Sequence, residues 1–207
     1  MKFENTEVFN FEGALRGMRN PKNSWSKSDS YYGNNEVGLE SYVIGPNDLQ
    51  LAQTLIRAGS EHRKFMRQIF VSVDITAPLY WWKEFDTYKV GTVANSTSTM
   101  HKLASTPITM KCFEMCDFAD NNEESNNYNL YTKTMWSKLI DHLEALRKEF
   151  NETKDKRYWK ELIRLLPESW LQKRTVTMDY ENLLVICSKG QRRFHKLTEW
   201  SKSFIDW

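Results

Sequence analysis

The sequence predicts a mixed α/β fold of the α+β class, formed by a single domain over residues 1–207. Three observations lead to this prediction. Short segments with alternating apolar residues lie in the first half of the chain, amphipathic helical patterns dominate the second half, and no internal repeat is visible. The chain has 207 residues, of which 40% are hydrophobic, and this is enough for one sizeable core.

The first segments predict short elements around one long loop. Residues 1–11 suit a strand, because Phe9 and Phe11 alternate around Asn10, and residues 12–18 suit a helical turn. Residues 20–38 are rich in Asn, Ser and Gly and are predicted as a long loop. Three aromatic residues in this loop need burial or a flat ligand, and packing on the domain surface or on a partner subunit is the favoured use. They are Trp25, Tyr31 and Tyr32.

A short strand and a helix are predicted next. Residues 41–45 read as the strand, and Pro46 then suits the start of a helix that Gly59 ends. The following sequence SEHRKFMR places an imidazole and three cations before the central strand. This group is interpreted as a solvated basic edge, with an anion site as the alternative.

The central stretch, residues 65–101, predicts a strand, a short helix and a polar loop. Ile69, Val71, Val73 and Ile75 alternate with polar residues, which is typical of a strand with one buried face. Pro78 suits the first turn of a helix that extends over residues 79–88. After Gly91, residues 92–99 are mainly Thr, Ser and Asn and predict an ordinary solvated connection, with a loop that forms a ligand pocket as the alternative.

The second half predicts helices separated by a second loop. Residues 100–104 suit a helical turn, and residues 119–129 are polar enough to form the loop. Residues 131–150 show the clearest helical spacing, and residues 155–166 form a second amphipathic helix that Pro167 ends. Residues 173–178 suit a strand or turn, residues 180–188 are helical or extended, and residues 192–207 predict a last helix.

Charge and cysteine content narrow the function classes. The net charge of +2 gives no strong field for nucleic acid or membranes, and the predicted location is cytoplasmic, with no membrane association. Three cysteines indicate a reduced environment, and Cys112 and Cys116 are interpreted as thiols rather than metal ligands, so no metal is predicted. The eight Trp residues suggest a rigid core or an aromatic subunit interface.

Several segments, in this order, resemble the flavin-dependent thymidylate synthases (ThyX). That family has a strand, often an Ala-Pro, a helical turn with a Gln, and the signature Arg-His-Arg-x-x-Ser-x-Asn-Glu-x-Ser-x-Arg-Tyr. The matching parts of this chain are residues 59–65, residues 73–78 with Glu84 at the Gln position, Asn95 with Ser98, residues 165–167, and residues 192–195 with Glu199 and Trp200.

The signature is incomplete in this chain. Thr87, Tyr88 and Lys89 stand where the family has Arg-His-Arg. Ser96 replaces the signature Glu, Met100 its final Arg and His101 its Tyr. In the family the lost cations hold flavin and nucleotide phosphates, and lysine does not reproduce the bidentate contacts of arginine.

The resemblance implies the ThyX fold, with a central antiparallel or mixed sheet and long helices, assembled as a homotetramer. It implies binding of FAD and of a pyrimidine deoxynucleotide, dUMP, with one-carbon transfer to C5 of uracil. The implied flavin contacts are Lys89, Asn95, His101 and Arg63. The implied nucleotide contacts are Glu84, Ser98, Arg192 and Arg193. No catalytic residue is assigned, because the flavin carries the chemistry.

Two further hypotheses stay open at the level of sequence. The first is a catalytically degenerate ThyX-fold protein that binds a nucleotide or serves assembly without flavin, which the missing Arg-His-Arg favours. The second is nucleic-acid binding, which rests on SEHRKFMR and SKGQRRFHK alone. Flavin colour in the purified protein separates the enzymatic hypothesis from the degenerate one. A steep salt dependence of DNA or RNA binding would support the nucleic-acid-binding hypothesis.

Overall fold

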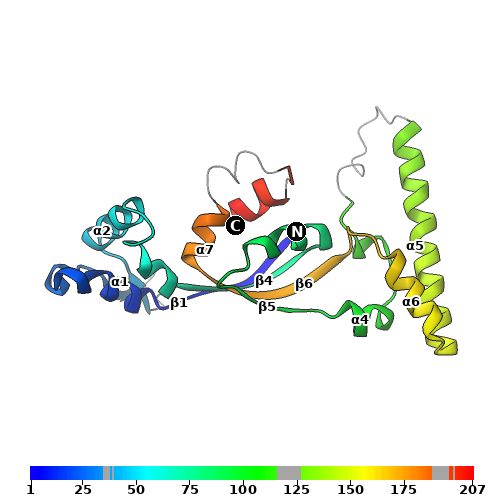
Figure 1. Ribbon diagram of the computed structural model, residues 1–207, viewed down its shortest axis with the longest axis horizontal. Coiled ribbons are helices and arrows are strands. Elements are labelled where there is room, and N and C mark those ends of the chain that lie inside the picture. Colours follow the sequence, from blue (N-terminus) through cyan, green and yellow to red (C-terminus); the bar gives the residue numbers. More distant parts are fainter. Residues whose placement is uncertain (35–37, 39, 116–126, 188–195, 198) are drawn as a thin grey trace. The chain divides into compact units, whose positions relative to one another are not determined.

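Figure 1 shows the computed structural model of the chain, which describes residues 1–34, 38, 40–115, 127–187, 196–197 and 199–207. The chain divides into two compact units. The α1–α2 unit comprises residues 3–74, 88–94 and 175–207, and the α5–α6 unit comprises residues 1–2, 75–87 and 95–174. We propose that residues 1–207 form one domain, which consists of these two units.

Strands and helices of several lengths confirm the predicted mixed α/β class. A four-stranded sheet has the order β1-β4-β6-β5, and β2 and β3 form a separate antiparallel hairpin. The strands are β1 (Lys2–Phe9), β2 (Tyr31–Asn34), β3 (Glu40–Val43), β4 (Phe70–Pro78), β5 (Val93–Ser96) and β6 (Leu171–Asp179).

In the part of the chain that the structure describes, the helices fall into α-helices, short 3₁₀ turns and one π-helical segment. The α-helices are α1 (Phe11–Arg19), α2 (Pro46–Arg57), α3 (Leu79–Phe85), α4 (Thr99–Lys102), α5 (Asn127–Thr153), α6 (Lys156–Leu165) and α7 (Tyr180–Ile186). The 3₁₀ turns are η1 (Asn20–Lys22), η2 (Trp25–Lys27), η3 (Lys64–Gln68), η4 (Asp86–Tyr88), η5 (Leu103–Ser105) and η6 (Met110–Cys112). The π-helical segment is η8 (Glu199–Phe204).

The period-two pattern of the central strand is confirmed. Val71, Val73 and Ile75 are buried, whereas the residues between them are only half-buried, as expected for a strand with one face on the core. Pro78 ends β4 in extended conformation and precedes α3, so its expected place in the first helical turn is wrong. Trp81, Trp82 and Phe85 are the buried residues of α3.

Two segments that were predicted as loops contain strands. Residues 93–96 form β5, an exposed strand at the edge of the sheet. Polar residues suit an edge strand, because they discourage pairing with another chain. The segment 20–38 contains η1, η2 and β2, and Tyr31 pairs with Val43 of β3. The predicted loop 119–129 lies mostly outside the described residues, and α5 begins at Asn127.

Each unit has its own apolar cluster. In the α1–α2 unit, α1, α2 and η3 pack through Ala14, Leu15, Met18, Ala52, Phe65, Met66 and Ile69. In the α5–α6 unit the cluster consists of Leu103, Ile108, Phe113, Ile140, Leu143, Leu146 and Leu162. Both predicted amphipathic helices of the second half therefore bury the faces that their spacing indicated.

A polar clamp holds residues 104–108 against α5. Glu144 accepts two hydrogen bonds from Arg147, at 2.6 and 2.7 Å, and one from the backbone N–H of Ile108 at 2.8 Å. Arg147 and Asn151 both donate to the carbonyl of Ala104, at 3.2 and 2.9 Å. The side-chain hydrogen bond from Arg147, followed by the backbone bond and nearby cations, lowers the pKa of Glu144 to about 2 against the opposing effect of burial.

We expect this clamp to stabilise the fold above about pH 4.5 and to weaken as the pH falls toward 2. A carboxylate with a lowered pKa in the folded state stabilises that state only while it is ionised, by up to about 3 kcal/mol for such a shift. Urea unfolding of wild type and Glu144→Gln between pH 2 and 6 measures this. The difference in unfolding free energy between the two should shrink as the pH falls, and a constant difference would contradict the assignment.

Among the described residues, no helix is long and apolar enough to cross a membrane. The predicted last helix, residues 192–207, is described only from residue 196, apart from residue 198, and contains the π-helical segment η8. Trp200 and Phe204 are buried. Phe3 of β1 stacks on Trp207 with ring centroids 5.1 Å apart, so the end of the chain packs on the first strand of the same unit.

Candidate functional site

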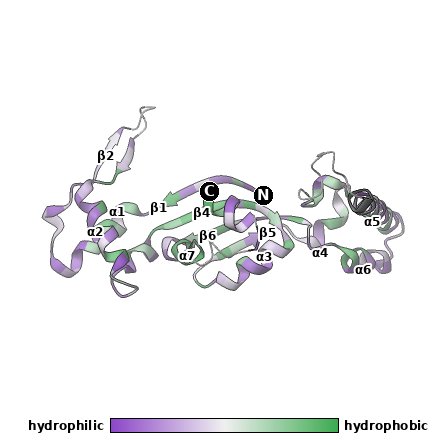
Figure 2. Cartoon of the chain, turned by 90° about the horizontal axis from the view of Figure 1, so that it is seen from above, coloured by the Kyte–Doolittle hydropathy of each residue, from purple (hydrophilic) through white to green (hydrophobic). Residues whose placement is uncertain are grey.

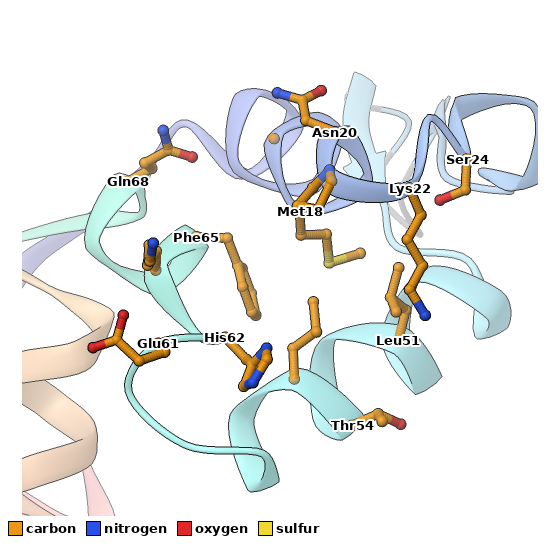
Figure 3. Close-up of a pocket in the computed structure, with 14 residues that line it drawn as sticks. Met18, Asn20, Lys22, Ser24, Leu51, Thr54, Glu61, His62, Phe65 and Gln68 are labelled. Carbon is orange, nitrogen blue, oxygen red and sulfur yellow. The ribbon is translucent and has the colours of Figure 1, made fainter.

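The α1–α2 unit contains a pocket of about 530 Å³ between α1, η1, α2 and η3, which we call the α1–η3 pocket. Figure 3 shows Met18 and Phe65 pointing into its centre and Leu51 closing it from α2. Met18 and Phe65 are nearly fully buried core residues whose edges form the floor of the pocket. The volume lies in the range of small-molecule sites, and such sites are mostly apolar with a few polar groups.

Basic side chains and polar groups surround this apolar floor. Lys22 extends from η1 toward α2, and His62 points into the gap between α2 and η3, as Figure 3 shows. Lys64 also lines the pocket, and all three side chains are exposed. Glu61 lines the pocket as well, but in Figure 3 its carboxylate points away from the centre. The pocket thus combines an apolar floor with a cationic rim, which suits an aromatic ligand that carries phosphate.

A buried ion pair fixes the loop that follows α1 on the N-terminus of α2. Arg19 is 5% exposed and donates from Nε to Oδ1 of Asp48, which is fully buried, at 2.6 Å. The other carboxylate oxygen of Asp48 accepts hydrogen bonds at 2.6 Å from the hydroxyls of Ser28 and Ser30. Burial is the largest influence on the Asp48 pKa and raises it, but the hydrogen bonds from Ser28, Ser30 and Arg19 outweigh burial and leave the pKa lowered. The ion pair therefore holds the wall of the pocket that carries Lys22.

Arg63, an expected flavin contact, is engaged in an ion pair. Its Nε donates to Glu181 at 2.9 Å, and Arg67 donates to the second oxygen of the same carboxylate. The hydrogen bond from Arg67 and then that from Arg63 lower the pKa of Glu181. Two guanidinium groups thus share one carboxylate at the junction of η3 and α7, and the carboxylates of Asp179 and Glu61 also act on Arg67.

Three expected contacts lie close together in sequence in the α5–α6 unit. Ser98 is the N-cap of α4, and its hydroxyl accepts a hydrogen bond at 3.1 Å from the backbone N–H of His101. The side chain of His101 is exposed, and so is that of Asn95 on the edge strand β5. The structure thus gives Ser98 a structural role as a cap, while Asn95 and His101 remain accessible to a ligand.

The remaining expected contacts differ in their surroundings. Lys89 lies in the turn before β5 with its side chain exposed, and its carbonyl accepts two hydrogen bonds from Thr92 at 2.9 and 2.8 Å. Glu84 is half-buried near the end of α3, where its carbonyl accepts from Thr87 at 2.8 Å. Arg192 and Arg193 lie outside the described residues.

Tyr88, which stands at the position of the missing signature His, packs on an aromatic residue of the C-terminal segment. The centroid of its ring lies 5.3 Å from that of the buried Trp200. The residue at this position therefore contributes to the core of the α1–α2 unit. Its aromatic character has a packing reason that is independent of any ligand.

Sequence reasoning did not assign Lys22, His62 and Lys64 to a site. His62 and Lys64 belong to the basic group of residues 62–67 that was interpreted as a solvated edge, and Lys22 belongs to the predicted loop. Two signals pointed to this segment: the anion-site alternative for that group, and the family resemblance of residues 59–65. Among the described residues no cluster of three metal-ligating side chains occurs, and Cys116 lies outside them.

Comparisons with known proteins give a clear result only at the level of structure. No protein-family model and no curated protein matches the chain. Two crystal structures of ThyX from Helicobacter pylori, described as a flavin-dependent thymidylate synthase and as thymidylate synthase X, match all of it. Both contain FAD and dUMP, both share 15% sequence identity with this chain at a TM-score of 0.64, and the matches cover 91% and 90% of those chains. The chain therefore has the fold of the flavin-dependent thymidylate synthases.

Proposed function

We propose that this chain is a flavin-dependent thymidylate synthase-like protein that binds FAD and dUMP and transfers one carbon to C5 of uracil. The observation that carries the proposal is the α1–η3 pocket, with its apolar floor and cationic rim, in a chain whose whole length matches the ThyX fold. Residues 59–65, which carry part of the sequence resemblance, form one wall of this pocket.

The side chains of the pocket fit the chemistry of a flavin. Met18, Leu51 and Phe65 offer an apolar surface for a flat ring system, and burial of such a ring is favourable. Lys22 and Lys64 supply ammonium groups, and His62 supplies an imidazole, for phosphate oxygens. In this proposal the two ammonium groups supply positive charge in place of the missing Arg-His-Arg, without its bidentate geometry. When bound, reduced flavin supplies hydride to the uracil ring.

The contacts that the resemblance implies belong to the same proposal. Lys89, Asn95 and His101 have exposed side chains and are further proposed flavin contacts, each within its own unit. Arg63, whose guanidinium is paired with Glu181, is another. Glu84, Ser98, Arg192 and Arg193 are the proposed nucleotide contacts. We further propose that the protein is a homotetramer and that it is located in the cytoplasm. Light scattering of the purified protein measures the mass of the assembly directly.

A second candidate function has its own support. Ser98 caps α4 and Tyr88 packs on Trp200, so two positions of the signature region have structural partners. Arg63, in the earlier segment 59–65, is bound to Glu181. This favours a descendant of the fold that binds a nucleotide without flavin. Titration with FAD and, separately, with dUMP distinguishes the two, because only the enzymatic proposal requires flavin binding.

A further inference from the structure

A second cavity, of about 310 Å³, lies beside the β2–β3 hairpin in the α1–α2 unit, and we call it the aromatic cavity. Four aromatic rings line it together with polar and charged side chains of α1 and the following loop. The lining residues are Glu12, Arg16, Arg19, Trp25, Ser28, Ser30, Tyr31, Tyr32 and Tyr42. Figure 2 shows the hairpin standing away from α1 and α2, two helices of the same unit. None of these residues belongs to the α1–η3 pocket.

Three of the four rings of this cavity are exposed, whereas Tyr42 is half-buried. Trp25, Tyr31 and Tyr32 are 50%, 59% and 57% exposed, whereas Trp81 and Trp82 are fully buried. The sequence required burial or a flat ligand for these three rings, and within the chain they are not buried. Clustered exposed aromatic residues mark interaction sites in monomeric proteins.

Hydrogen bonds hold the rings in place. Trp25 Nε1 donates to Asn20 at 2.8 Å, and the Tyr32 hydroxyl donates to Glu12 at 2.9 Å. The rings of Tyr32 and Tyr42 meet edge to face at 5.3 Å. The loop beneath them is fixed by Asp48 through the hydroxyls of Ser28 and Ser30. A ligand therefore meets three rings, those of Trp25, Tyr32 and Tyr42, that are already ordered, which reduces the entropic cost of binding.

One cation of the cavity is available to a ligand. Arg19 is buried against Asp48, but Arg16 is 67% exposed and its NH1 lies 3.6 Å from Glu12. An exposed pair at this distance contributes little to stability, so Arg16 can turn to a stronger acceptor such as phosphate. The cavity thus offers stacking surfaces next to a single guanidinium group.

We propose that the aromatic cavity binds a nucleotide. Its base stacks on the aromatic rings, and its phosphate contacts Arg16. The volume of the cavity, at the lower limit of small-molecule sites, admits one base rather than an extended chain. Every base presents a π-face for stacking, and phosphate matches guanidinium geometry. The base comes from a mononucleotide or from a single-stranded nucleic acid. This proposal is independent of flavin binding in the α1–η3 pocket.

Calorimetric titration of the full chain with AMP, adenosine and ribose 5-phosphate tests the proposal. AMP should bind, and Tyr31→Ala should weaken it about tenfold through lost stacking. Trp25→Ala should also weaken AMP binding. Tyr31→Ala is less prone to disturb the fold, because the Tyr31 ring is the most exposed of the three. Arg16→Gln should weaken AMP while leaving adenosine unchanged. The matched control is Tyr131→Ala on α5, whose side chain is 66% exposed and lies in the α5–α6 unit.

Other outcomes would overturn the proposal. No AMP binding to the wild type, or an equal loss in Tyr131→Ala, contradicts it. Loss of AMP binding in Lys22→Glu/Lys64→Glu but not in Tyr31→Ala would place the nucleotide in the α1–η3 pocket instead. A change of mass in solution for Tyr31→Ala, without AMP binding, would identify the rings as a contact between copies of the chain.

A hexanucleotide identifies the source of the base. If it binds more tightly than AMP and with a steeper salt dependence, the site serves single strands, because several phosphates then release counterions. If it binds no more tightly than AMP, the site serves free nucleotides. Both results require the loss in Tyr31→Ala to appear for the same probe.

Discussion

Asp48→Ala should destabilise the protein more than any other single polar substitution that the structure suggests. It leaves the guanidinium of Arg19, which is 5% exposed, without its carboxylate, and it removes the acceptor of Ser28 and Ser30. Breaking a buried pair by removing one partner typically costs about 3–5 kcal/mol. For a chain of this length the expected fall in melting temperature is about 10 °C or more.

Thermal and urea unfolding measure this loss, with Asp141→Ala as the control. Asp141 is an exposed carboxylate on α5, so its removal should change the unfolding free energy by less than about 0.5 kcal/mol. The double variant Arg19→Met/Asp48→Leu should be more stable than Asp48→Ala, because no charge is then left buried. Equal stability of Asp48→Ala and Asp141→Ala would show that the loop after α1 is not held by this pair.

Lys22→Glu/Lys64→Glu should weaken FAD binding at least tenfold. Both side chains are exposed on the rim of the α1–η3 pocket, so their reversal removes attraction for phosphate without disturbing the core. A hydrogen bond to a charged group contributes about 1.5–3 kcal/mol, and two such contacts are lost. Fluorescence titration with FAD measures the change, and the melting temperature should stay close to that of the wild type.

The matched control for charge is Lys138→Glu/Lys160→Glu. These lysines are exposed on α5 and α6, and their reversal changes the net charge of the protein by the same amount. If this control weakens FAD binding as much as Lys22→Glu/Lys64→Glu, the loss reflects the overall electrostatic field of the protein rather than contacts in the pocket. If neither variant changes binding, flavin does not use this rim.

The parts of the fold that follow from local patterns were predictable. The alternation of Val71, Val73 and Ile75 determined β4, and the spacing of three and four residues determined α5 and α6. The strand β5 was predicted as a loop because its polar residues carry no apolar period. Its conformation depends on its place beside β6 in the sheet, which lies far away in sequence.

The candidate site was harder to predict than the fold. The α1–η3 pocket exists because α1 and η3 pack side by side, and this brings Lys22 near His62 and Lys64. No local sequence pattern predicts that residues so far apart in the chain line the same pocket. Ser98 was assigned to a ligand through a motif, whereas the structure gives it a partner three residues away. A hydroxyl of this kind suits both roles, so sequence spacing alone did not separate them.

The central claim is tested most directly by a visible spectrum and thermal melt of the purified protein, with and without added FAD and dUMP. We expect flavin absorbance or a rise in melting temperature of several degrees with FAD, because a ligand that binds only the folded state stabilises it. The rise should be lost in Lys22→Glu/Lys64→Glu. A colourless protein whose melting is unchanged by FAD would contradict the claim, and a shift with dUMP alone would then support the nucleotide-binding descendant without flavin.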